Sequence, residues 1–234
     1  MVLPHAAEFT PYDASHLGAL AVLVVGAAVL VVVGRRLRER DPADRLGKAM
    51  AVAMLAMTLP LQVLYFTPDY WNVQKTLPIQ LCDLASFVSS YALWTHRRWA
   101  VGLTYYWGLT LTTQAILTPD LDSAFPDPIF LLFWGMHVGT VWAAIYLVWG
   151  RGVTPDWRTF RVAVLATAVW AASVFTLNVL AGTNYGFLNR KPSAASALDL
   201  LGPWPWYVLL EIAIIIAAWA LATWPWVRGG RRAG

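Results

Sequence analysis

The sequence predicts an all-α protein: a polytopic membrane helical bundle of seven transmembrane helices, with the N-terminus outside the cell and the C-terminus in the cytoplasm. Hydrophobic residues make up 59% of its 234 residues and charged residues only 13%, whereas soluble domains carry about 25% charge. The apolar residues form long runs separated by short charged segments, which is typical of multi-pass membrane proteins. Basic residues collect in alternate segments, and this pattern indicates the orientation.

Seven segments are long enough to cross a hydrocarbon core of about 30 Å at about 1.5 Å per residue. The third is the weakest, because it contains Cys82, Asp83 and several serines. The connections are too short for a separate soluble domain, so residues 1–234 are expected to form one membrane domain. The predicted segments are His16–Val33, Leu46–Phe66, Leu77–Trp94, Trp99–Leu117, Ile129–Trp149, Arg158–Leu180 and Trp204–Trp226.

Lysine and arginine predict the orientation, since cytoplasmic loops carry the excess of positive charge. The other set of loops contains only Lys75, Arg190 and Lys191, and includes an acidic loop with Asp120 and Asp122. Many of the 14 tryptophans fall near segment ends, where an interfacial belt belongs. The predicted cytoplasmic set holds 14 of the 17 basic residues: Arg35, Arg36, Arg38, Arg40, Arg45, Lys48, Arg97, Arg98, Arg151, Arg158, Arg161, Arg228, Arg231 and Arg232.

Several functional classes are disfavoured by the residues present. Cys82 is the one cysteine, so neither an internal disulfide nor a CxxC motif can form. The four histidines make no HxxxH pair, and no glycine-rich nucleotide loop is present. We therefore expect no metal and no soluble cofactor. The net charge of +4 is explained by membrane topology, so no nucleic-acid partner is expected.

The strongest polar residues of six segments are predicted to lie at one depth. In the alternating topology they fall within roughly the outer 12 Å of the apolar slab, at 1.5 Å per residue. Polar groups inside a membrane usually face the bundle interior and mark function. The alternative is a hydrogen-bond network that only holds the helices together. The residues are Gln62, Gln80, Cys82, Asp83, Gln114, His137, Asn178 and Glu211.

Three features carry a family resemblance: LPIQLCDLASF at Leu77–Phe87, His137 in the fifth segment, and NYGFLNRKP with LDLLGPWPWY within Asn184–Tyr207. Together they resemble the YwaF-type integral membrane family of bacteria, whose eukaryotic relative is transmembrane protein 164. The resemblance covers essentially the whole chain. It implies a multi-pass protein of the bacterial plasma membrane and a lipid acyltransferase that works through a cysteine acyl-enzyme with a histidine partner. One departure is Gln80, where many relatives have histidine.

The resemblance maps the nucleophilic cysteine to Cys82 and its partner to His137, with membrane phospholipid and lysophospholipid as the substrates. His137 would take the thiol proton, and Asp83 or Glu211 would orient the imidazole as the third member of a triad does. Water would replace the acceptor if the enzyme is a lipase. The expected substrate-binding residues are Gln62, Gln80, Gln114, Asn178, Asn184, Tyr185, Arg190 and Lys191, of which Gln80, Gln114 or Asn178 would donate to the oxyanion and Arg190 with Lys191 would hold the phosphate.

Two other functional classes remain open from the sequence. Asp83, His137 and Glu211 are also the residues that a proton-coupled transporter or a small-molecule binding protein would use. A receptor or structural subunit without chemistry is the third class. The lipid class, the acyl-chain preference, the oligomeric state and the balance between transfer and hydrolysis are not encoded in any readable pattern.

Overall fold

The computed structural model describes residues 9–119, 121, 123–192 and 197–230 of the chain. This part is predominantly helical, which confirms the predicted all-α class. Asp120, Asp122, Arg231 and Arg232 lie outside the described residues. The elements are α1 (Ala14–Arg40), α2 (Arg45–Tyr65), α3 (Leu81–Thr95), α4 (Arg98–Tyr106), η1 (Trp107–Thr112), α5 (Thr113–Leu117), α6 (Pro128–Ile145), η2 (Tyr146–Gly150), α7 (Trp157–Ala181), η3 (Tyr185–Phe187), η4 (Ala197–Leu201) and α8 (Trp206–Gly230).

Five of these helices are long and apolar enough to cross a membrane: α1, α2, Pro128–Gly150, α7 and Trp206–Arg228. The two remaining predicted segments are also helical, but they are shorter or composite. Helix α3 has 15 residues and begins at Leu81, so the predicted start at Leu77 was wrong. The fourth segment is built from α4, the π-helical η1 and α5 in succession.

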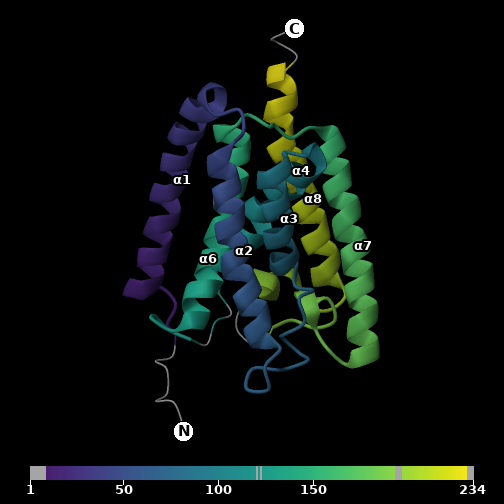
Figure 1. Ribbon diagram of the computed structural model, residues 1–234. Coiled ribbons are helices and arrows are strands. Elements are labelled where there is room, and N and C mark those ends of the chain that lie inside the picture. The colour runs from purple at the N-terminus through teal and green to yellow at the C-terminus, as the bar shows by residue number, and fades with distance from the viewer. Residues whose placement is uncertain (1–8, 120, 122, 193–196, 231–234) are drawn as a thin grey trace.

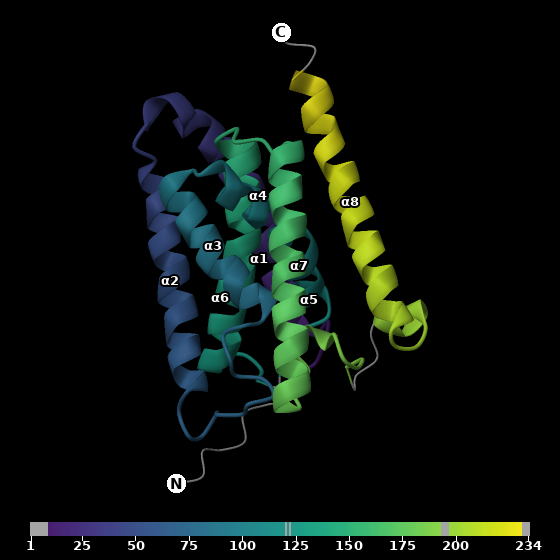
Figure 2. The ribbon, with the colours of Figure 1, turned by 90° about the vertical axis from the view of Figure 1, so that its right-hand side faces the viewer.

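The helices run side by side, with α1 on one flank of the bundle and α7 and α8 on the other (Figure 1). Helices α2, α3 and α6 contact one another, and η1 contacts both α3 and α6. We call the end at which α1 and α8 finish the basic end, because Arg38 and Arg151 lie there. The other end carries the long connections 66–80 and 182–205, and we call it the loop end. Toward the loop end, α8 leans away from the other helices (Figure 2).

Aspartates fix where four of the helices begin. The side chains of Asp13, Asp44, Asp127 and Asp156 each accept a hydrogen bond from a backbone N–H in the first turn of α1, α2, α6 and α7, respectively. Such N-caps satisfy donors that lack a partner within the helix. These residues come directly before apolar runs, so the caps set the level at which each run starts.

Aromatic side chains fill the core in the half of the bundle nearer the basic end. Tyr106, Tyr146 and Trp219 are at most 1% exposed. The Tyr106 hydroxyl pairs with Thr223 at 2.7 Å, and Trp219 Nε1 donates to Thr110 Oγ1 at 3.1 Å. These bonds join α8 to α4 and η1. The half nearer the loop end is therefore the part where α8 is less tightly held.

Candidate active site

The start of α3 lies inside the bundle, because the connection before it folds inward from the loop end. Trp170, near the middle of α7, donates its indole N–H to the carbonyl of Ile79 at 2.8 Å. Tyr185 fixes the same connection, accepting from the backbone N–H of Leu77 at 2.9 Å and donating to the carbonyl of Val73 at 2.7 Å. These contacts hold the first turn of α3 well below the loop end.

Cys82 is the second residue of α3, where the first backbone N–H groups of the helix have no acceptor within the helix. The N–H groups of Asp83 and Leu84 donate to the carbonyl of Gln80. Among the described residues, the N–H groups of Leu81 and Cys82 have no hydrogen-bond acceptor. A helix N-terminus carries a partial positive charge, which favours an anionic group placed there. The first turn of α3 therefore offers two free donors beside the thiol.

Two polar contacts join α2 to α3 at this level. The amide of Gln62 donates to Asp83 Oδ1 at 2.8 Å, and both side chains are buried. One turn closer to the basic end, Thr58 and Ser86 share a hydrogen bond of 2.5 Å. The two helices are thus in register, with Gln62, Cys82 and Asp83 together one turn farther toward the loop end.

Helices η1 and α6 reach the same level from the other side. A Cβ on Gly108 of η1 would lie 3.2 Å from the carbonyl oxygen of Thr140 in α6, so the two backbones touch there. The two helices are antiparallel, and one turn from this contact toward the loop end they carry Thr112 and His137. The Thr112 hydroxyl faces the Cys82 thiol. Cys82 also packs against a small apolar cluster formed by Leu61 of α2 with Ile129 and Met136 of α6.

The ring of His137 is fixed in one tautomer. Its Nδ1 lies 2.8 Å from the carbonyl oxygen of Phe133, which can only accept, so Nδ1 carries the hydrogen. Nε2 then presents a lone pair, and no described residue donates to it. The Phe133 ring, 4.1 Å away between centroids, holds the imidazole in place. The orienting partner is therefore a backbone carbonyl, and not Asp83 or Glu211 as expected from the sequence.

Buried polar atoms without a partner gather around these residues. Within the described part of the chain, Gln62 Oε1 and Thr112 Oγ1 are fully buried and lack regular hydrogen bonds. Leaving such an atom unsatisfied costs about 1–3 kcal/mol, so atoms of this kind often mark a site for a ligand or for water. We call Gln62, Cys82, Asp83, Thr112 and His137 the Cys82 cluster.

Asn178 and its neighbours have a structural role in the loop end. The Asn178 amide donates to the Tyr185 carbonyl at 2.9 Å and to Asn189 Oδ1 at 2.8 Å. Its oxygen accepts from Thr183 and from the Tyr185 N–H, both at 2.8 Å. Asn184 likewise bonds to the backbone of Arg190. These side chains are occupied in shaping the loop, so Asn178 has no donor left for an oxyanion.

Three other predicted residues lie outside the Cys82 cluster. Gln114 is exposed, and Gln80 is half-buried at the start of α3. Glu211 lies on the same face of α8 as Trp219, which contacts η1, and it is half-buried. No described residue forms a hydrogen bond or ion pair with the Glu211 carboxylate. Of the eight polar residues that were predicted to converge, four belong to the Cys82 cluster: Gln62, Cys82, Asp83 and His137.

Arg190 and Lys191 lie near the start of α8, apart from this cluster. Arg190 is exposed. Lys191 Nζ is 3.7 Å from Asp199 Oδ1 and 5.6 Å from the centre of the Tyr207 ring. The pair thus lies at the loop end, at the edge of the region where α8 leans outward (Figure 2).

A family model describing the TMEM164 family matches residues 11–223. The chain belongs to the TMEM164 family. This match includes all members of the Cys82 cluster and ends within α8, and it confirms the resemblance seen in the sequence. No match was found among curated proteins or among solved structures. The family and the apolar helices together show that the chain is a membrane protein.

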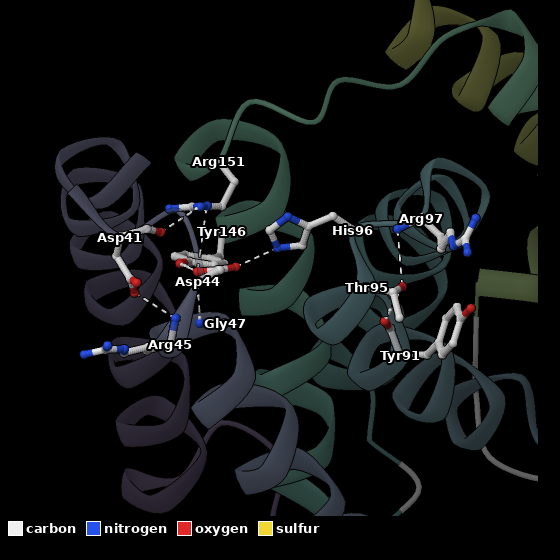
Figure 3. A network of polar contacts seen from close by, with 10 residues as sticks. All are labelled: Asp41, Asp44, Arg45, Gly47, Tyr91, Thr95, His96, Arg97, Tyr146 and Arg151. Carbon is white, nitrogen blue, oxygen red and sulfur yellow. Dashed lines mark hydrogen bonds and ion pairs between the residues drawn. The ribbon is translucent and has the colours of Figure 1, made fainter. Parts of the chain in front are cut away.

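This TMEM164-family protein has a second buried polar cluster, at the basic end, that sequence reasoning missed (Figure 3). Asp44, only 3% exposed, lies 2.6 Å from His96 Nε2 and 3.7 Å from Arg151 Nε, and it accepts a hydrogen bond from the Tyr146 hydroxyl. We call these four residues the Asp44 network. It joins the α1–α2 turn, the α3–α4 turn and the end of η2.

The charge state of Asp44 follows from these partners. Burial would raise the pKa of its carboxyl group, but hydrogen bonds from His96, Tyr146 and the Gly47 N–H, with the charge of Arg151, lower the pKa below its usual 3.8. A Cβ on Gly47 would lie 2.3 Å from Asp44 Oδ2, so glycine is needed there. The sequence signal for this network was an aspartate three residues before a glycine at a helix start, which is typical of an N-cap. The sequence does not show that His96 and Tyr146 bind the same aspartate.

Proposed function

We propose that this protein crosses the membrane of a bacterial cell seven times as a single domain, with the loop end outside and the basic end in the cytoplasm. The positive-inside rule supports this orientation, because Arg38, Arg97 and Arg151 are all at the basic end. Helix α3 is short for a full span, and the inserted connection before it makes up the remaining depth.

Within this frame, we propose a membrane-embedded phospholipid acyltransferase with Cys82 as nucleophile and His137 as base. The observation that carries the proposal is that α3 and α6 contact each other and carry, at one level of the bundle, a thiol at a helix N-terminus and a histidine whose Nε2 accepts no hydrogen bond from a described residue. Nucleophilic catalysis needs such a thiol and base close together. Membership of the TMEM164 family supports the same assignment, because the resemblance seen in the sequence implies a lipid acyltransferase.

The first step forms the acyl-enzyme. Nε2 of His137 takes the proton of the Cys82 thiol, and the thiolate attacks the carbonyl carbon of a phospholipid ester. The backbone N–H groups of Leu81 and Cys82 donate to the oxyanion as it forms, as free donors at a helix start do in other enzymes. Collapse of the tetrahedral intermediate breaks the ester C–O bond. The lysophospholipid leaves with the proton from His137.

The second step reverses these transfers with a new acceptor. His137 takes the proton of a lysophospholipid hydroxyl, and that oxygen attacks the thioester. The thiolate of Cys82 leaves and regains its proton from the imidazolium. Water in place of the lysophospholipid would give hydrolysis. Asp83, held by Gln62, lies next to the thiol, whereas Glu211 lies on α8 outside the cluster, so we assign Glu211 no step.

The substrate would reach Cys82 from the lipid beside α8. The first half of α8 leans outward (Figure 2), and Leu209 and Leu210 there are 52% and 47% exposed. Arg190 and Lys191 lie at the loop end of this region and would bind the headgroup phosphate. A transporter would need Asp83, His137 and Glu211 along one route, but Glu211 lies apart from the other two. The enzyme is therefore the function that the geometry supports best.

The proposal is tested by acyl transfer in phospholipid vesicles. Purified protein is reconstituted with a phospholipid carrying labelled acyl chains and with an isotopically distinct lysophospholipid acceptor. We expect labelled chains on the acceptor, with loss of transfer in Cys82→Ala and a drop of at least about a hundredfold in His137→Ala. Gln114→Ala is the control, because its side chain is exposed. Full transfer by Cys82→Ala would overturn the proposal.

A further inference from the structure

A surface pocket lies at the basic end, far along α6–η2 from the Cys82 cluster. It is formed where the last turns of α1, the end of η2, the connection after η2 and the end of α8 meet. Arginine and tryptophan side chains dominate its walls, and none of these residues has a part in the proposed acyl transfer. The lining residues are Arg35, Arg38, Glu39, Val148, Trp149, Gly152, Thr154 and Trp226.

Two guanidinium groups enter the pocket, and each is anchored on one side only. Arg35 Nε donates to the Trp149 carbonyl at 3.2 Å. Arg38 donates from Nε and Nη2 to the Gly150 carbonyl, at 3.3 Å and 2.9 Å. In these bonds both terminal nitrogens of Arg35 and the Nη1 of Arg38 remain unused. The pocket therefore presents fixed N–H donors to an anion, and its two arginines outnumber the one lining carboxylate, Glu39.

Gly152 holds one of these groups in place. Its φ of +78° is a backbone conformation that favours glycine, and a Cβ there would lie 2.6 Å from the Arg38 guanidinium carbon. The guanidinium thus lies flat on the backbone after η2. A pre-positioned arginine loses little conformational entropy when it binds an oxyanion.

The inner wall is aromatic and continues into the apolar flank of the bundle. The Trp149 and Trp226 rings meet edge to face, with centroids 5.5 Å apart, and Trp226 Nε1 donates to the Tyr105 hydroxyl at 3.3 Å. Val32 of α1 and Leu221 of α8 are 48% and 63% exposed on the helices that flank the pocket. A ligand with both an anionic head and an apolar tail matches these two surfaces.

We propose that this pocket binds the phosphate headgroup of an anionic phospholipid, with Arg35 and Arg38 on the phosphate and the acyl chains against Trp149 and Trp226. Tryptophans belong at the headgroup level of a membrane, and basic pockets between membrane helices are suited to anionic headgroups. A soluble phosphate would use the arginines but not the apolar wall. The site is separate from the Cys82 cluster, so it binds lipid that is not undergoing acyl transfer.

Native mass spectrometry of the full chain tests the proposal, with dioleoyl phosphatidylglycerol and dioleoyl phosphatidylcholine as probes. We expect phosphatidylglycerol to bind more tightly than phosphatidylcholine, and Arg35→Gln to weaken its binding by about fivefold. Arg36→Gln is the matched control, since it removes the same charge from the next residue of the helix, outside the pocket. We expect this control to change binding by less than about twofold.

Three outcomes would overturn the proposal. Equal losses in the two arginine variants would show diffuse attraction to surface charge, and no loss in Arg35→Gln would show that the pocket is not used. Displacement of phosphatidylglycerol by inorganic phosphate would show a site for soluble anions. Thermal unfolding in phosphatidylcholine checks that Arg35→Gln folds, and no change is expected because Arg35 is exposed. Trp226→Leu alters the pocket from α8 and is also expected to weaken the binding of phosphatidylglycerol.

Discussion

The side-chain amide of Gln62 donates a 2.8 Å hydrogen bond to the carboxylate of Asp83, inside the bundle and next to Cys82. This bond is the direct polar link between α2 and the first turn of α3. It leaves Gln62 Oε1 buried without a partner, facing the same cluster. The Gln62 amide therefore fixes the turn that carries the thiol, and its Oε1 atom can still accept a hydrogen bond from a ligand.

Replacing Gln62 by alanine is expected to lower acyl transfer about tenfold, because the Asp83 carboxylate then loses its donor and the first turn of α3 loses its tie to α2. Losing the hydrogen-bond partner of a buried carboxyl group should also cost about 2 kcal/mol of stability. Transfer in vesicles and thermal unfolding in detergent measure the two effects. Gln114→Ala, an exposed residue of the same type, should alter neither. Equal transfer by both variants would contradict the assignment of Gln62 to the site.

Asn178→Ala is expected to destabilise the loop end by about 2–3 kcal/mol, because it removes four hydrogen bonds and leaves the buried N–H and carbonyl of Tyr185 unsatisfied. Limited proteolysis should cut between residues 182 and 205 more readily, before any change in helix content. Thr176→Ala, an exposed position on the same helix, serves as the control. Unchanged proteolysis in Asn178→Ala would show that the anchor is dispensable.

Acid should weaken the Asp44 network. Because the pKa of the Asp44 carboxyl is lowered below 3.8 in the folded protein, its ionised form stabilises the fold above that pH, and this contribution is lost as the pH falls through the folded pKa. Asp44→Asn leaves Arg151 without its charge partner and should cost about 3 kcal/mol at neutral pH. Thermal unfolding from pH 7 to pH 3 should show the two proteins converging, whereas the exposed Asp69→Asn should follow the wild type. A constant gap would contradict the charge state given to Asp44.

Gly34 allows the backbone of α1 to approach the backbone at the end of η2 closely. A Cβ at this position would lie 2.7 Å from the Gly150 Cα and 3.0 Å from the Tyr146 ring. Gly34→Val should therefore cost about 1–3 kcal/mol through forced separation of the helices, measured by thermal unfolding. Gly18→Val tests the same change on the same helix where nothing lies within 4 Å, and it should be nearly neutral. Equal effects would show that α1 is not packed through Gly34.

Apolar runs were sufficient to predict the five helices that are long and apolar enough to cross a membrane, because hydrophobic length is a local property of the sequence. The start of α3 was predicted four residues too early, at Leu77. Its true start depends on Tyr185 and Trp170, which bind the preceding connection from more than 90 residues away along the chain. A distant hydrogen bond of this kind leaves no periodic signal.

The candidate site was predicted in part. Cys82, Asp83, His137 and Gln62 do lie on packed neighbouring helices, since depth along a helix can be counted from the sequence. Depth does not give the direction of a side chain around the helix axis, and so Gln114 was included although it is exposed. The partner of His137 was also missed, because a backbone carbonyl such as that of Phe133 has no signature in the sequence.

The central claim is that Cys82 carries an acyl group during turnover. Because Cys82 is the one cysteine of the chain, intact-protein mass spectrometry after brief incubation with a phospholipid of defined acyl chains gives an unambiguous readout. We expect a mass increase matching one acyl group, removed by hydroxylamine and absent in Cys82→Ser and His137→Ala. Acyl transfer that continues at full rate with an unmodified, alkylated or substituted Cys82 would contradict the central claim.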